Sequence, residues 1–195
     1  MARIEPLEHA TATSAQRATL DEITARWGRA TNMKRTLARS PVALRALMEW
    51  YPLRDAVEPV LGERLTAIFC HAISAQSDCL ICSTYFRREL IDAGENPDEL
   101  ALDEREQAVA EFGRQLMIDS NGVTDELYAR LSAFLTDEQL IDLTTFGALM
   151  VATNIFNNAL HVPLDEYLFA YRRADGQPAG NEPGLAAPGE VVPHG

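Results

Sequence analysis

The chain has 195 residues, of which 47% are hydrophobic and 24% are charged. This balance is typical of one soluble globular domain, and it excludes a disordered, collagen-like or disulfide-framed chain. Its 17 basic and 29 acidic residues give a formal net charge of −12, which disfavours nucleic acid and anionic membrane surfaces as partners. Lys34 is the only lysine, and we interpret this as a compositional bias.

Apolar residues recur at intervals of three and four along residues 1–173, which predicts helices throughout and no strand. The first helix ends near Gly28. Ser40 and Pro41 are typical of the N-cap and the first residue of another helix. Two prolines, Pro52 and Pro59, are expected to bracket a short connecting piece.

The helices in the middle of the chain are predicted at about residues 62–75 and 79–92, and Ser77 or Asp78 is expected to cap the second. Further helices are predicted at about residues 103–119, 124–134, 136–160 and 164–171. The third of these four is apolar on most sides, which predicts a central position or a subunit interface. The Pro- and Gly-rich residues 174–195 are expected to form a disordered tail after a single domain, residues 1–173.

No apolar run approaches the ~20 residues needed to cross a bilayer, and the first ten residues lack the pattern of a signal peptide. We therefore expect a cytoplasmic protein. Its three cysteines, Cys70, Cys79 and Cys82, are too few and too clustered for a structural framework. In a reducing compartment such a pair is more often redox-active or metal-binding.

The segment Cys79-Leu80-Ile81-Cys82 is the most informative part of the chain. Residues three apart in the first turn of a helix lie on one side, so the two sulfurs can meet and both feel the positive end of the helix dipole. Thiols placed in this way have a pKa lowered from ~8.5 toward ~3.5 to 7.5, and the thiolate attacks peroxides and disulfides. The alternative is a pair of buried structural cysteines.

The helix before the pair has a face opposite its apolar stripe that is formed by Glu63, Ala67, Cys70, His71 and Ser74. This face carries few charges, and we interpret it as the wall of a site. The alternative is an ordinary solvated face.

The three cysteines and His71 also add up to a set of ligands that zinc accepts. We disfavour a zinc site because the side chains of Cys70 and His71, which are adjacent on one helix, diverge by about 100°.

From about Thr31 to Leu168 the sequence resembles the carboxymuconolactone decarboxylase and alkylhydroperoxidase D superfamily, in particular its larger peroxidase-related members. The resemblance rests on four features in the same order: residues 37–41, the Cys-x-x-Cys helix, the acidic helix after Asp103, and residues 154–164. It implies an all-α, compact multi-helix alkylhydroperoxidase D-like domain that forms a homo-oligomer and reduces organic hydroperoxides.

The same resemblance implies that Cys82 is the peroxidatic thiol and Cys79 the resolving one. The family has a glutamate twelve residues before the first cysteine and a histidine four residues after the second, and this chain has Ala67 and Phe86 there. We hypothesise that His71, one helical turn after Ala67, acts as the base, oriented by Glu63 or assisted by Ser74. A merely packed or surface histidine is the alternative.

The sequence thus predicts a thiol-dependent oxidoreductase with no bound cofactor or metal, because the sulfurs themselves carry the electrons. Its substrate would be a hydroperoxide or another small molecule, and an external thiol or lipoyl-type reductant would reset the disulfide. Two alternatives remain open: a decarboxylase-like enzyme of the same fold that acts on a small carboxylate or lactone, and a non-catalytic helical oligomer.

Overall fold

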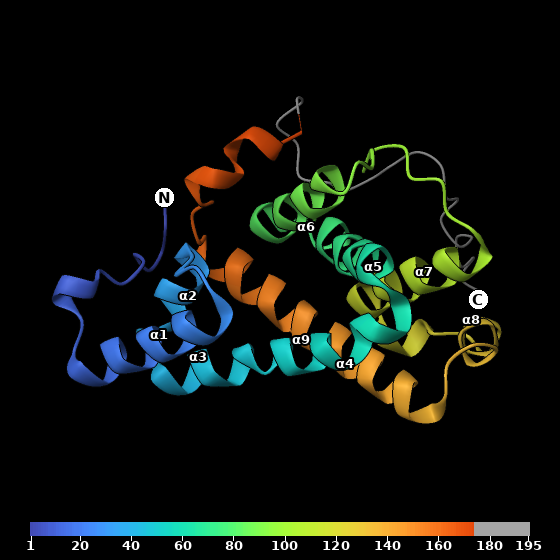
Figure 1. Ribbon diagram of the computed structural model, residues 1–195, viewed down its shortest axis with the longest axis horizontal. Coiled ribbons are helices and arrows are strands. Elements are labelled where there is room, and N and C mark those ends of the chain that lie inside the picture. The colour runs from blue at the N-terminus through green and yellow to red at the C-terminus, as the bar shows by residue number, and fades with distance from the viewer. Residues whose placement is uncertain (174–195) are drawn as a thin grey trace, which may run out of the picture.

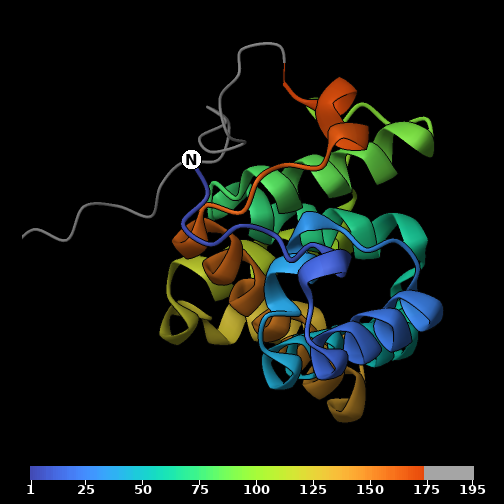
Figure 2. The ribbon, with the colours of Figure 1, turned by 90° about the vertical axis from the view of Figure 1, so that its left-hand side faces the viewer.

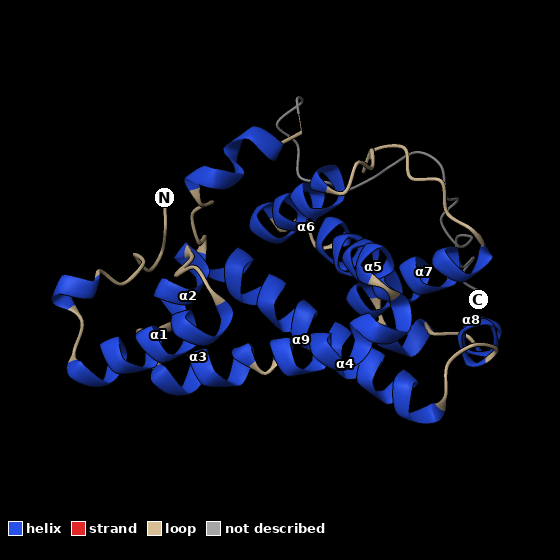
Figure 3. Cartoon of the chain, viewed as in Figure 1, coloured by secondary structure: helices blue, strands red, loops and turns tan. Residues whose placement is uncertain are grey.

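The structure is a computed structural model that describes residues 1–173 (Figure 1), and the predicted tail at 174–195 lies outside the described residues. The described part is all-helical and has no strand, which confirms the predicted class (Figure 3). Its α-helices are α1 (Ser14–Trp27), α2 (Asn32–Leu37), α3 (Pro41–Met48), α4 (Trp50–Leu61), α5 (Glu63–Gln76), α6 (Leu80–Asp92), α7 (Glu104–Ile118), α8 (Asp125–Ser132) and α9 (Asp137–Leu160). Three short 3-10 helices are η1 (His9–Thr11), η2 (Ser120–Gly122) and η3 (Glu166–Tyr171).

Local signals in the sequence account for several helix ends. The Ser40 hydroxyl accepts the amide N–H of Ala43 at 3.3 Å, and Pro41 is the first residue of α3, as predicted. At the start of α9, Thr136 and Gln139 form a reciprocal capping box that satisfies two amide N–H groups at the helix end.

The two prolines expected to bracket a connecting piece both lie inside α4, so that prediction is wrong. Pro52 is the third residue of the helix, where an amide N–H has no partner within the helix and its loss costs little. Pro59 removes one hydrogen bond from the last turn. Burial of Val57 and Leu61 offsets this loss, because α4 packs along α9 and α5. The short helix α2 was not predicted either.

Helix α5 forms the middle of the main core and packs against α4, α6, α7 and α9 (Figure 1). At its centre Phe69 is fully buried and stacks with Phe112 of α7 and Phe146 of α9, with ring centroids 6.3 Å and 6.0 Å apart. Glycine permits this approach. A Cβ atom on Gly147 would lie 2.9 Å from the Phe69 ring, and one on Gly113 would lie 3.1 Å from the Phe69 backbone oxygen.

Helices α1, α2 and α3 form a second layer, which lies nearest the viewer in Figure 2. Leu20, Leu37 and Leu44 make its own small core. Met33 and Phe156 pack against both cores and join the layer to the second half of α9.

Helix α9 is, within residues 1–173, the one helix long and apolar enough to cross a bilayer by length and composition. Its position explains its composition, because Leu143, Phe146 and Met150 are buried in the main core. It also leaves Ile141 and Ile155 exposed, at 65% and 55% of their surface. Self-association through such a face stays a prediction.

Candidate active site

The first cysteine of the pair is itself the N-cap of α6, so the expected cap at Ser77 or Asp78 is wrong. Only a tight turn separates α5 from α6: Ser77 ends α5 and Asp78 has a left-handed φ of 52°. The amide N–H of Cys79 then donates to the Ser74 carbonyl at 3.1 Å, and the Cys79 carbonyl accepts the amide N–H of Ser83 at 2.9 Å. These bonds fix Cys79 at the positive end of α6.

The two thiols are free, buried and in contact: Cys79 is 0% and Cys82 is 4% exposed. The Cys82 side chain hydrogen-bonds Cys79 and, with the amides of Cys82 and Ile81, lowers the Cys79 pKa, although burial opposes this. Burial, followed by the interaction with Cys79, raises the pKa of Cys82 well above its usual value. These opposite directions favour Cys79 over Cys82 as the thiolate of the pair.

Asn157 of α9 reaches the pair from the opposite side. Its Nδ2 donates to Cys82 Sγ at 3.2 Å, and the amide lowers the pKa of both thiols. No sequence pattern pointed to this contact, although Asn157 belongs to the stretch on which the family resemblance rests. A buried amide in an apolar helix is the signal that could have identified it, because buried polar groups need partners.

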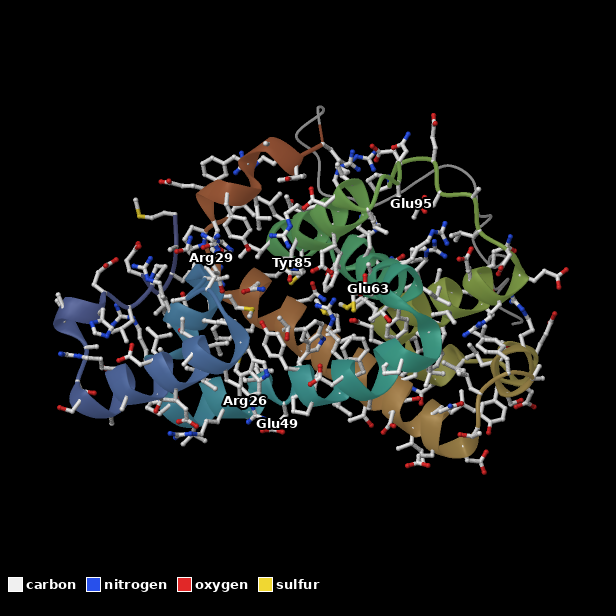
Figure 4. The ribbon with its side chains drawn as sticks, in the orientation of Figure 1. Arg26, Arg29, Glu49, Glu63, Tyr85 and Glu95 are labelled. Atoms are coloured by element: carbon white, nitrogen blue, oxygen red, sulfur yellow. The ribbon has the colours of Figure 1, made fainter. Side chains whose placement is uncertain are left out.

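Cys82 also lines a cavity of about 100 Å³ between α6, α9 and the N-terminal layer, whereas Cys79 lies outside its lining. Figure 4 shows Tyr85, another lining residue, between α6 and α9. The lining is mostly apolar and aromatic, and includes Met48, Trp50, Tyr51, Phe86 and Met150. Phe86 stands where the resemblance would place a histidine, so this wall offers no proton carrier at that position.

His71 lies in a different electrostatic environment from the cysteine pair. Burial, followed by the charge of Arg87, lowers the His71 pKa to about 4, while Asp98 opposes this shift. Its Nε2 is buried, and no hydrogen-bond partner for it lies within residues 1–173. The imidazole is therefore neutral at neutral pH.

The other residues of the predicted relay are not joined to His71 by any hydrogen bond or ion pair within the described residues. Glu63 is exposed in the first turn of α5 (Figure 4). The buried Ser74 hydroxyl donates to the Cys70 carbonyl at 2.7 Å. A catalytic role for His71, assisted by Glu63 or Ser74, stays a prediction.

The low pKa of the half-buried His71 imidazole makes the free energy of unfolding depend on pH. The folded protein keeps His71 neutral down to about pH 4, whereas the unfolded chain binds a proton near 6.5. The contribution of neutral His71 to the free energy of unfolding is therefore complete above pH 6.5, and it is lost as the pH falls to about 4. The loss should reach up to about 3 kcal/mol in the free energy of unfolding.

Urea unfolding of the parent and of His71→Asn between pH 7 and pH 4 measures this loss, because the difference between them cancels the titration of carboxylates. His9→Asn is the control, since the His9 side chain is 57% exposed. A parent-minus-variant difference that stays constant from pH 7 to pH 4 would contradict the prediction.

Cys70, the third cysteine, is a buried neutral thiol next to a network of charges. Burial raises its pKa well above the usual value, and the charges of Arg54, Glu89 and Glu58 act on it as well. Arg54 Nε donates to the Glu58 carboxylate at 2.6 Å. Cys70 and His71 thus face different charged groups, in keeping with their divergence on α5. Within residues 1–173, no three His, Cys, Asp or Glu side chains form a group that could hold a metal ion.

No family model and no curated protein matches the chain. Several solved structures do match. An alkylhydroperoxidase AhpD core, an uncharacterized peroxidase-related protein from Ralstonia eutropha JMP134, is 21% identical with a TM-score of 0.66, and the match covers 86% of this chain and 94% of that one. A peroxidase-related protein from Silicibacter sp. TM1040 is 14% identical with a TM-score of 0.68, covering 86% and 96%.

A third similar structure is a cysteine-to-alanine variant of the debrominase Bmp8 in complex with 2,3,4-tribromopyrrole. It is 16% identical with a TM-score of 0.70, and the match covers 86% of this chain and 94% of that one. At such identities the likeness shows the fold alone. This chain has the alkylhydroperoxidase D-like fold, as the sequence resemblance implied.

Proposed function

We propose that the chain is a thiol oxidoreductase that reduces hydroperoxides through Cys82 and Cys79. The observation that supports this proposal is that the two thiols differ in position and in the direction of their pKa shifts. Cys82 lines an apolar cavity, while Cys79 lies outside that lining, hydrogen-bonds Cys82 and has a lowered pKa. One sulfur can meet a substrate, and the other is already in place to close a disulfide.

The reaction begins when the Cys82 thiol passes its proton to the Cys79 thiolate. Cys82 Sγ then attacks the outer oxygen of the hydroperoxide, so that an S–O bond forms, the O–O bond breaks, and the alkoxide takes the proton from Cys79. In the second step the Cys79 thiolate attacks Cys82 Sγ; an S–S bond forms, the S–O bond breaks, and hydroxide leaves and is protonated by solvent. An external dithiol returns two electrons and two protons.

The pair must supply its own base in this scheme, because Ala67 and Phe86 cannot carry a proton. General acid–base assistance typically contributes ~10² to 10⁴-fold to a rate. We therefore expect a slower peroxidase than an enzyme that has both the glutamate and the histidine. Asn157 partly compensates, since its amide N–H stabilises the Cys82 thiolate as it forms.

Counting thiols tests the proposal. The reduced parent has three free cysteines, and treatment with cumene hydroperoxide should leave one. Mass spectrometry should find the peptide that contains Cys79 and Cys82 lighter by two hydrogens. Cys70→Ala should still lose two thiols. Three free thiols after treatment would contradict the proposal and favour the acid–base or non-catalytic alternatives.

Reductive dehalogenation by the same pair is a second candidate, favoured by the aromatic and thioether side chains around the cavity. An aryl bromide and two thiols would give the arene, a disulfide and hydrogen bromide, which balances atoms and electrons. Bromide release from 2,3,4-tribromopyrrole in the presence of dithiothreitol measures it. Release of bromide without consumption of hydroperoxide would replace the first candidate by the second.

A further inference from the structure

Lys34 is a buried cation in the wall of the cavity that Cys82 lines. Its side chain belongs to α2 and is only 2% exposed. Its Nζ donates to the carbonyls of Trp27 and Gly28 at 2.9 Å and 3.3 Å, and lies 5.1 Å from the centre of the Tyr51 ring. An ammonium group has three N–H donors, so one remains for another acceptor.

This cation has no anionic partner within the described residues. Its acceptors are neutral carbonyls, and burial is the only cause that lowers its pKa, to about 8. At neutral pH the group is therefore mostly charged. A buried ammonium without a paired anion is costly, and proteins normally pair or neutralise such groups. The missing anion can come from a ligand, because the same residue lines the cavity.

Asp165 also lines the cavity, and its charge belongs to a different set of contacts. Its Oδ1 accepts the amide N–H of Asn32 at 2.9 Å. Burial raises the pKa of Asp165, and the Asn32 amide and the charges of Arg29 and Arg35 oppose this shift. The cations that act on Asp165 are therefore these arginines, whereas the positive charge of Lys34 has no anionic partner among residues 1–173. Lys34 is thus the charged group of the cavity wall with which a negative ligand would pair.

We propose that the cavity takes a small apolar molecule that carries a carboxylate, with Lys34 pairing the carboxylate while the reactive end faces Cys82. The apolar and aromatic lining matches the body of such a molecule, and a cavity of about 100 Å³ limits that body to about one ring. The reactive end rests on the function proposed above. The anion site rests on Lys34 alone, so the anion site and the proposed reaction at Cys82 can fail separately.

Binding is tested first, without any reaction, in Cys82→Ser. The probes are 4-isopropylbenzoate and its neutral isostere 4-isopropylbenzamide. Because the chain has one lysine, its side-chain NMR signals report Lys34 without mutation of the site. We expect the benzoate to bind at least tenfold more tightly than the amide and to raise the Lys34 pKa from about 8. Equal binding of the two probes, or a Lys34 pKa that does not change, would overturn the proposal.

Lys34→Met provides the second test. It should remove the preference for the benzoate and leave binding of the amide unchanged, which also shows that the variant is folded. Arg26→Met is the matched control, because Arg26 is an exposed cation on α1 outside the cavity lining (Figure 4), and it should keep the preference. Retention of the preference in Lys34→Met would assign the anion to another group and overturn the proposal.

The reactive end is then tested with cumene hydroperoxide and its para-carboxylate in the parent protein. The carboxylated peroxide should react at least tenfold faster, and Lys34→Met should abolish the difference. If neither peroxide oxidises the pair although the benzoate binds at Lys34, the proposed function fails and the anion site stands. If both peroxides oxidise the cysteine pair at equal rates, the proposed function stands and the anion site at Lys34 fails.

Discussion

Replacement of Cys82 by serine is expected to lower the rate of hydroperoxide consumption by at least about 10³-fold, because an unactivated hydroxyl is a far weaker nucleophile than a thiolate. Cys82 is the cysteine of the pair that lines the cavity, and Cys79 is not part of the lining. Stopped-flow measurement of peroxide consumption by reduced protein gives the rate. Circular dichroism checks that the variant keeps its helices.

Replacement of Cys79 by serine should have a different effect. Cys82 can still attack once, although more slowly because the Cys79 thiolate no longer takes its proton. We therefore expect consumption of one thiol and a sulfenic acid on Cys82 that dimedone traps. Cys70→Ala is the control and should behave as the parent, because the pKa of the buried Cys70 thiol is well above its usual value. If Cys79→Ser loses the first step and Cys82→Ser keeps it, then Cys79 is the attacking thiol.

Replacement of Phe69 by alanine should destabilise the protein by about 3–5 kcal/mol, the usual cost of emptying a large aromatic site. Phe69 is 0% exposed and its ring lies between those of Phe112 and Phe146. The glycines on α7 and α9 leave little room for the surroundings to collapse into the space, because the three helices are already in close contact. The cost should therefore fall in the upper part of that range.

Urea unfolding followed by circular dichroism measures this destabilisation. Phe169→Ala is the matched control, since Phe169 is 50% exposed and a surface substitution usually changes stability by less than about 0.5 kcal/mol. A change below about 1 kcal/mol for Phe69→Ala would show that α5 is not the centre of the core.

The sequence was sufficient for features determined by near neighbours. The capping pairs at Ser40 and Thr136 depend on residues three positions away, and the helices begin where those pairs predict. The two prolines of α4 misled the prediction, because their local cost is outweighed by packing against helices distant in the sequence.

The parts of the site that could not be predicted depend on distant contacts. Asn157 meets Cys82 across 75 positions of the chain. Lys34 was conspicuous as the only lysine, yet nothing in its own neighbourhood shows that it faces a cavity formed with α6 and α9. His71 was placed on the correct helix, but the charges that act on it come from α6, α7, the 93–103 loop and Arg173, which follows η3.

Synthesis on the ribosome proceeds from the N-terminus, so α9 is the last long helix to emerge, after every helix against which it packs. Until residue 160 has left the exit tunnel, the apolar faces of α4 and α5 that it covers stay open to water. At about 5–20 residues per second, that interval lasts several seconds. Nascent chains that stop short of α9 should therefore be strong clients of chaperones, and the completed helix should release them.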